Sequence, residues 1–294
     1  MAKGTNQKLK LSYVRRIVMP ELPEVETIKR IIEPQLVGRR IDAVNILNSQ
    51  IIAYPSADEF VAACQSKTIK AMSRRGKFLT IHFEDGSRIS LHLRMTGQLL
   101  VMPEDYPMEK HTHLIMNLSD GKQIRYIDVR RFGRFWYLKP DEEDTINGME
   151  KLGPEPDDPV LTGAYLQDKL GKKKKAIKEM LHDQSVVAGI GNVYSDEILY
   201  ASGIYPESKC VELTAEDWGT IAANIKKVIA WGIDLNKMTP EEYLEGKGKE
   251  YRNTPFLKVY GHEGKQCEKC GSIFERITIG GRSSCFCPKC QEKP

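Results

Sequence analysis

The stretch that decides the fold is KFLTIHFEDGSRISLHL, residues 77–93. Two short runs rich in apolar, β-branched and aromatic residues flank Asp85-Gly86. Asp-Gly between such runs is a strong hairpin signal because both residues tolerate positive φ. HLIMNL (113–118) and QIRYIDV (123–129) repeat the arrangement around Asp120-Gly121. These hairpins predict an antiparallel β-sandwich.

A helix is predicted in front of the sandwich. In residues 23–36 the apolar residues recur at helical spacing with charges between them, at Val25, Ile28, Ile32 and Leu36. Pro34 falls inside this window, and a proline removes a backbone donor from a helix, so we expect the last turn to be distorted or to end early.

Beyond the sandwich the pattern changes. KLGPEPDDPV (151–160) is rich in proline and acidic residues, and helical patterns follow it. Residues 238–255 are polar with scattered glycine and proline and predict a mobile loop. The fold class is therefore α+β and multidomain. The predicted division is an N-terminal extension (1–19), a β-sandwich domain (20–150), a linker (151–160), a helical domain (161–258) and a cysteine-rich module (259–294).

Composition describes a folded, non-membrane protein. Of 294 residues, 40% are hydrophobic and 29% charged, and the net charge of +4 is a weak indication of a polyanionic partner. No apolar run approaches the ~20 residues that span a bilayer. The first 18 residues lack the apolar segment of a secretion signal, although their basic character also fits a transit peptide. Three cysteines without an obvious partner favour a reducing compartment, and we expect the cytoplasm.

Four cysteines form two C-x-x-C pairs near the C-terminus, and this spacing is typical of a zinc ribbon: Cys267, Cys270, Cys287 and Cys290. Four thiolates close the coordination shell of the metal, so the predicted cofactor is one structural Zn²⁺. Two disulfides or free thiols are the alternative. Cys285 stands outside the spacing and is not expected to bind the metal.

Basic residues gather in several places, each with an ordinary explanation as solvated surface. Gly280-Gly281 predicts a hairpin tip that displays Arg282, either as a surface residue or as a phosphate ligand. The run KKKK ends at Lys175, and DVRRFGRF (128–135) interleaves arginine with phenylalanine. GIGN (189–192) leads into a helix whose free N–H groups suit an anion. Together these features favour a nucleic acid partner.

From residue 19 onward the chain resembles the bacterial formamidopyrimidine-DNA glycosylases. The resemblance rests on motifs in the same order: MPELPEVET (19–27), RRGKFL (74–79), HLRMTG (92–97), DVRRFG (128–133), LGPEP (152–156), KKKAIK (173–178), GIGNVYSDEIL (189–199) and the cysteine pairs. It implies a β-sandwich, a helix-two-turn-helix domain and a zinc finger. It also implies a monomeric bacterial repair enzyme that removes oxidised purines from damaged double-stranded DNA and cleaves the strand.

The resemblance assigns roles by position. Pro20 would be the nucleophile that forms a Schiff base with C1′, Glu21 the proton shuttle, Lys77 an assistant in base loss, and Arg282 a phosphate ligand linked to elimination. Met95, Arg130 and Phe132 would fill the gap left in the duplex. His111, Lys174 and Asn192 would contact phosphate.

The chemistry suits these residue types. A secondary amine condenses to a permanently charged iminium, which acidifies C2′ and drives elimination without a further cofactor. A neighbouring carboxyl can supply the proton transfers. For Lys77 we expect the like charges of Arg74 and Arg75 to favour the neutral amine.

Residues 1–18 depart from the family pattern, because with them attached the nitrogen of Pro20 is an amide. We therefore expect Met19 to be the true initiator and residues 1–18 to be absent from the active protein. A DNA-binding protein without catalysis, its amine blocked, is the alternative. Residues 238–255 also differ from the family's purine-covering loop, so an oxidised-pyrimidine glycosylase stays open. A zinc module that docks a protein is a third possibility.

Overall fold

The computed structural model describes residues 20–293, so the expectations for residues 1–19 lie outside the described part. Its helices and strands follow in chain order: α1 (Leu22–Leu36), β1 (Ile41–Ile46), η1 (Ser49–Ile51), β2 (Ile52–Tyr54), α2 (Ala57–Cys64), β3 (Ile69–Arg75), β4 (Phe78–Phe83), β5 (Arg88–His92), β6 (Gly97–Pro103), β7 (Thr112–Leu118), β8 (Lys122–Asp128), β9 (Arg134–Leu138), η2 (Met149–Lys151), α3 (Gly163–Leu170), α4 (Ile177–Leu181), α5 (Asn192–Ser202), η3 (Cys210–Glu212), α6 (Ala215–Leu235), α7 (Pro240–Glu245), η4 (Thr254–Phe256), β10 (Glu275–Ile279) and β11 (Arg282–Phe286).

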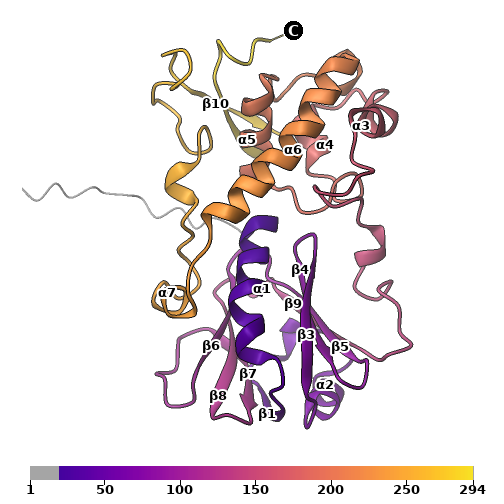
Figure 1. Cartoon of the computed structure of the whole chain (residues 1–294), viewed down its shortest axis with the longest axis vertical. Coiled ribbons are helices and arrows are strands. Elements are labelled where there is room, and N and C mark those ends of the chain that lie inside the picture. The colour runs from indigo at the N-terminus through magenta and orange to yellow at the C-terminus, as the bar shows by residue number, and fades with distance from the viewer. Residues whose placement is uncertain (1–19, 294) are drawn as a thin grey trace, which may run out of the picture.

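The first half of the described chain forms a sandwich of two sheets (Figure 1), with strand orders β1-β7-β8-β6 and β2-β9-β5-β4-β3. Both predicted hairpins are confirmed. Gly86 between β4 and β5 has φ +85°, and Gly121 between β7 and β8 has φ +77°, so each turn uses the left-handed conformation that glycine allows. One pairing differs from the prediction: β2 runs parallel to β9, not antiparallel.

Helix α1 joins the two halves of the molecule. Val25, Ile28 and Ile32 are fully buried in the sandwich core, while Leu22 at the first turn packs into the core of the helical domain. The expectation of an early end at Pro34 is wrong, since α1 continues to Leu36. We attribute this to the burial of Leu36, which offsets the one backbone hydrogen bond that a proline removes.

The helical domain contains α3 to α6, with α6 as its longest helix (Figure 1). Residues 238–255, expected to be a loop, include the short helix α7, whose N-cap Thr239 and residue Glu242 form a capping box. Within residues 20–293, no helix combines the length and apolar content that a bilayer span requires.

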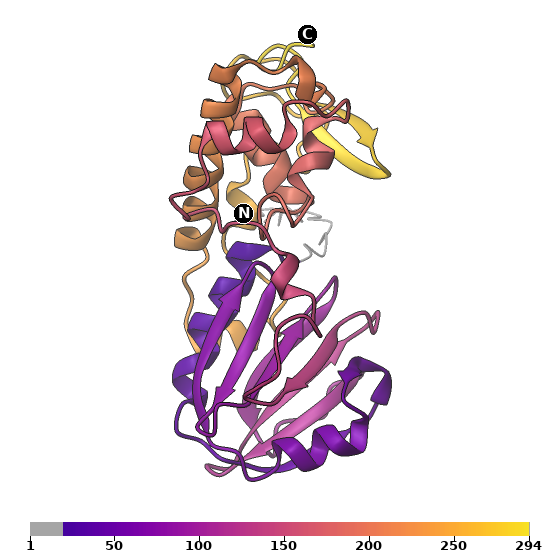
Figure 2. The same ribbon diagram turned by 90° about the vertical axis from the view of Figure 1, so that its right-hand side faces the viewer.

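The C-terminal module is the antiparallel hairpin β10–β11, with Gly280 and Gly281 at its tip at φ +55° and +76°. In Figure 2 this yellow hairpin projects from the side of the helical domain. The sandwich, the helical domain and the four-cysteine module together confirm the predicted α+β multidomain class.

Strand register brings several connections to one end of the sandwich. Arg75 pairs with Phe78 at the β3–β4 turn, and Phe78 pairs with His92 at the end of β5. His92 in turn pairs with Arg134 at the start of β9, and Gly97 at the start of β6 pairs with Asp128 at the end of β8. The turns that contain Lys77, Met95 and Arg130 therefore share this end.

Candidate functional site

Glu21 lies at the junction of the sandwich and the helical domain. It directly precedes α1 and follows Pro20, which is buried. Its carboxylate accepts hydrogen bonds from the backbone N–H groups of Gly191 (2.7 Å), Val193 (2.8 Å) and Tyr194 (3.3 Å). These N–H groups belong to the start of α5, where the first N–H groups have no partner within the helix. The carboxylate therefore caps α5 from another domain.

The environment of Glu21 favours the protonated acid. Burial, which removes water from the carboxylate, raises its pKa to about 7, and the charge of Lys77 and the N–H groups of Val193 and Tyr194 oppose the rise without cancelling it. A carboxyl whose pKa lies near neutrality can both give and take a proton at physiological pH.

Lys77 directly precedes β4 and reaches the same turn of the helical domain. Its Nζ donates a hydrogen bond to the carbonyl oxygen of Ile190 (2.9 Å), the residue before Gly191. Burial lowers the pKa of Lys77, with further lowering by Arg282 and Arg94, although Glu21 and Glu24 act in the opposite direction. A lysine whose pKa is lowered carries more of the neutral amine.

The predicted cause of this lowering is wrong. Arg74 and Arg75 turn away from Lys77 and bind the carboxylate of Glu155, at 2.6 Å and 3.0 Å. Arg74 also binds Glu26 at 2.8 Å. Because these guanidinium charges are neutralised by carboxylates, the burial of Lys77 is the main cause, and the predicted linker segment is anchored through Glu155.

Arg282 opens β11 and is exposed at the hairpin, close enough to Lys77 and His182 to lower the pKa of both. A buried pair holds this hairpin on the helical domain. Lys178 Nζ contacts Asp196 at 2.5 Å and the carbonyl oxygen of Ser283 at 2.9 Å. Lys178 lies three residues after the basic run that ends at Lys175, yet it is buried because it connects α4 to the hairpin.

The predicted gap-filling triplet is brought together. Arg130 Nη1 lies 2.9 Å from the sulfur of Met95, and its guanidinium carbon lies 4.6 Å from the centroid of the Phe132 ring. Met95 and Phe132, which both contact Arg130, are 36% and 45% exposed, which is high for large apolar side chains. The three residues form one exposed cluster at the end of the sandwich.

The three predicted phosphate contacts come from three different parts of the chain. His111 precedes β7 at the sandwich end, with φ +68°. Lys174 is exposed between α3 and α4. Asn192 begins α5, and its side-chain oxygen is buried without a hydrogen-bond partner among the described residues.

Two glycines allow Glu21 and Leu22 to approach α5 so closely. A Cβ on Gly191 would lie 2.4 Å from the carboxyl carbon of Glu21, and a Cβ on Gly189 would lie 2.4 Å from a methyl carbon of Leu22. Gly189 also has φ +92°. Both glycines of the GIG turn are therefore needed, because a side chain at either position would overlap Glu21 or Leu22.

Gly191→Ala is expected to displace Glu21 and to lower the turnover rate by about 100-fold, the usual scale for a lost proton-transfer group. Gly219→Ala is the matched control, since a Cβ there meets nothing within 4 Å and alanine favours helix α6. Turnover on a lesion duplex, with thermal melting of both variants, checks this. Equal turnover in the two variants would show that the close approach is unimportant.

The four predicted cysteines form one cluster, with their sulfur atoms within 4.8 Å of one another: Cys267, Cys270, Cys287 and Cys290. The sulfurs of Cys267 and Cys290 are 3.9 Å apart and those of Cys270 and Cys287 3.4 Å. Zn–S bonds of about 2.3 Å in a tetrahedron place sulfurs at about 3.8 Å, so the site fits Zn²⁺. Cys285 is outside the cluster, and its N–H donates to Asp196.

Zinc removal by a chelator is expected to unfold the hairpin and displace Arg282, with a loss of DNA affinity of at least about tenfold. Cys270→Ala should bind no zinc, whereas Cys285→Ala should keep one zinc per chain. Metal analysis and duplex binding measure both. Full affinity in the zinc-free protein would contradict a structural role.

Two site residues were missed in the sequence. His92 lies opposite Phe78 in the β4–β5 hairpin, and burial lowers its pKa to about 3, with Arg94 and Lys77 contributing, so it is neutral beside Lys77. The hairpin register through Asp85-Gly86 could have located it. Glu24 accepts hydrogen bonds from Tyr194 (2.8 Å), from Asn253 (2.8 Å) and from the backbone of Glu21 (3.0 Å). No local pattern reveals that network.

Comparisons with known proteins agree along the whole described chain. Residues 19–135 match the formamidopyrimidine-DNA glycosylase N-terminal domain, 152–243 its H2TH domain, and 264–293 a zinc finger found in FPG and IleRS. Curated proteins named formamidopyrimidine-DNA glycosylase are similar: one from Desulforamulus reducens is 41% identical (93% of this chain, 99% of the relative), and one from Bacillus subtilis is 40% identical (94% and 100%).

Solved structures agree as well. The Lactococcus lactis protein in complex with abasic-site DNA has a TM-score of 0.86 at 32% identity, and its complex with FAPY-dG-containing DNA has 0.86 at 34%. Each comparison covers 93% of this chain and 100% of the other. The shared arrangement extends over the sandwich, the helical domain and the cysteine module.

Proposed function

The chain belongs to the formamidopyrimidine-DNA glycosylase family, a family of DNA glycosylases, and we propose that it excises oxidised purines (8-oxoguanine and formamidopyrimidines) from double-stranded DNA and then cleaves the strand. One observation carries the proposal. Glu21 and Lys77, from different elements of the sandwich, converge on Ile190 and Gly191 beside buried Pro20. A proton-transfer acid and a partly neutral lysine thus meet next to the amine-bearing residue.

In the proposed reaction the free amine of Pro20 attacks C1′ of the damaged nucleotide. The bond from C1′ to the base breaks, and the base leaves with the proton that the attacking amine gives up. Glu21 gives a proton to the ring oxygen as the sugar opens, and the amine nitrogen and C1′ form the iminium. Loss of a C2′ proton expels the 3′ phosphate, and loss of a C4′ proton expels the 5′ phosphate. A carboxyl with a pKa of about 7 suits these transfers.

The remaining residues bind DNA in this proposal. Arg282 holds the phosphate at the reacting nucleotide, and Met95, Arg130 and Phe132 occupy the space that the flipped base leaves. His111, Lys174 and Asn192 contact the backbone. Because basic side chains that bind phosphates release counterions, duplex affinity should fall steeply with salt.

The proposal includes a monomer that works on chromosomal DNA in the bacterial cytoplasm. It also keeps the division into a catalytic sandwich (20–150), a linker (151–160), a DNA-binding helical domain (161–258) and a zinc finger (259–294). Oxidised pyrimidines are the second candidate substrate, because one solved Lactococcus lactis relative is bound to DNA that contains an oxidised pyrimidine.

Excision assays test the substrate. Duplexes with 8-oxoguanine, a formamidopyrimidine or thymine glycol should be compared under single-turnover conditions with a chain that begins at Pro20. Faster release of the oxidised purines, followed by products with phosphate at both ends of the gap, supports the proposal. Faster release of thymine glycol would favour the pyrimidine substrate, and binding without release would favour a non-catalytic protein.

A further inference from the structure

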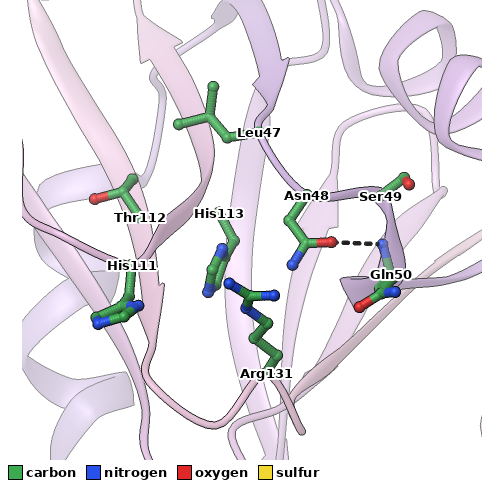
Figure 3. A pocket seen from close by; sticks show the side chains of 8 residues that line it. All are labelled: Leu47, Asn48, Ser49, Gln50, His111, Thr112, His113 and Arg131. Carbon is green, nitrogen blue, oxygen red and sulfur yellow. Dashed lines mark hydrogen bonds between the residues drawn. The ribbon is translucent and has the colours of Figure 1, made fainter.

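A hollow of about 540 Å³ lies beside the Arg130–Phe132 loop, and of its lining residues only His111 has a role in the function proposed above. It is lined by Leu47, Asn48, Ser49, Gln50, His111, Thr112, His113 and Arg131 (Figure 3). No carboxylate is among these residues. Figure 3 shows the guanidinium of Arg131 directed between His113 and the segment that carries Asn48 and Gln50. The lining thus offers hydrogen-bond donors around one cation, a combination that suits a phosphate.

Three side chains in this hollow have donors that are free of any partner in the described chain: Arg131, His111 and Asn48. Across residues 20–293, the guanidinium of Arg131 makes neither an ion pair nor a hydrogen bond, and the ring of His111 has no hydrogen-bond partner. Asn48 uses its side-chain oxygen to accept from the N–H of Gln50 at 3.1 Å, which leaves its NH₂ group available. The ring of His113, by contrast, is occupied by the carbonyl oxygen of Asp128 at 2.8 Å.

The backbone at this place is held in an unfavourable conformation. His111 and Arg131 have φ of +68° and +58°, in the left-handed region that residues with a Cβ rarely adopt. Both residues line the same hollow. Conformations of this kind cost of order 1–3 kcal/mol and cluster at binding sites, because the surrounding structure retains them for function.

Sheet order places the hollow on the far side of the exposed triplet from Lys77. In the order β2-β9-β5-β4-β3, Lys77 precedes β4, while the hollow lies at the start of β2, the opposite edge. The connections with Met95 and Arg130 lie between them, at β5 and β9. Three strand spacings of about 4.8 Å separate β4 from β2, roughly 14 Å. This is comparable with the ~12 Å major groove that separates the two DNA backbones.

We propose that this hollow binds a backbone phosphate of the undamaged strand, with Arg131 as the charged ligand and Asn48 and His111 as supporting donors. The inference rests on the proposed function, which puts the damaged strand at Lys77 and the triplet inside the duplex. The undamaged strand then passes the β2 edge. Arg131 grips it and fixes the width of the opened duplex while the triplet fills the gap.

The test measures binding of the full chain to duplexes with an uncleavable tetrahydrofuran abasic analogue, so no turnover is needed. Arg131→Gln should weaken duplex binding about tenfold and reduce the slope of log affinity against log salt concentration by about one. Its affinity for the damaged strand without its complement should not change. Asn48→Asp, which keeps an acceptor for Gln50 and adds a negative charge, should weaken it further. Arg40→Gln, at the opposite end of the sandwich, should bind like the wild type.

Single methylphosphonates identify the strand. In the wild type, neutralising one phosphate of the undamaged strand near the lesion should weaken binding, and Arg131→Gln should be insensitive to that same replacement. The inference is overturned if the Arg131→Gln variant is still weakened by methylphosphonates in the undamaged strand. It is also overturned if the variant becomes insensitive only to methylphosphonates in the damaged strand. In both cases the proposed function stands. A wild type without preference for the abasic duplex over an undamaged one overturns both.

Discussion

A chain that begins at Pro20 is expected to be trapped covalently on an abasic duplex by borohydride, whereas the chain with residues 1–19 attached shows no trapping above background. The reason is whether the nitrogen of Pro20 is an amine or an amide. In the longer chain the nitrogen of Pro20 is an amide whose lone pair is delocalised into the carbonyl group, so it cannot attack C1′. Gel mobility of the trapped complex and its intact mass measure the result.

Two controls separate the amine from other effects of the extension. Pro20→Gly in the chain that begins at residue 20 should keep weaker trapping, since glycine also presents a terminal amine. Both chain lengths should bind a tetrahydrofuran duplex, because the DNA ligands lie elsewhere. Equal trapping with residues 1–19 attached would exclude Pro20 as the nucleophile and direct attention to Lys77.

Local signals predicted the parts of the fold that local chemistry decides. Asp85-Gly86 and Asp120-Gly121 located hairpins because positive φ is a property of the turn itself. The cysteine spacing located the metal cluster because each C-x-x-C pair supplies two neighbouring ligands by itself. The sequence did not reveal the contacts of Lys178 and Glu155, since their partners Asp196 and Arg74 are distant in sequence. A lysine run and an acidic linker look alike whether they face solvent or another domain.

In the candidate site, too, local sequence predicted some features and missed those that depend on distant residues. The motifs supplied the residues, but the state of each one depends on burial that only the fold creates. Lys77 was expected to be influenced by neighbouring arginines, and those arginines are engaged by Glu155. Arg131 was noted only as one arginine of DVRRFGRF and Asn48 was not singled out, because the strand pairing that brings them to one hollow joins segments about 80 residues apart in the chain.

Glu21→Gln should reduce base release by at least about 100-fold, since the amide can neither give nor take the proton. The same substitution should stabilise the folded protein above neutral pH. The native pKa of Glu21 is raised by burial to about 7 from an ordinary 4.5, so between these values the folded state binds more protons than the unfolded state. The wild type therefore loses stability as pH rises through that range, and glutamine, which does not titrate, avoids the loss.

The size of the effect follows from the shift. At 1.36 kcal/mol per pKa unit, the free energy of unfolding of the variant minus that of the wild type should increase by about 3 kcal/mol from pH 4.5 to about pH 8. Chemical denaturation of the full chain across this range measures it. Glu26→Gln on the same helix is the matched control of opposite sign. Despite burial, hydrogen bonds from Arg74 and Arg30 lower the pKa of Glu26 below its ordinary 4.5, so its difference should decrease as the pH rises toward 4.5 and stay nearly constant above that pH. A pH-independent difference for Glu21→Gln would mean that Glu21 is ionised in the folded protein, and a group already ionised could not supply the proton that opens the sugar.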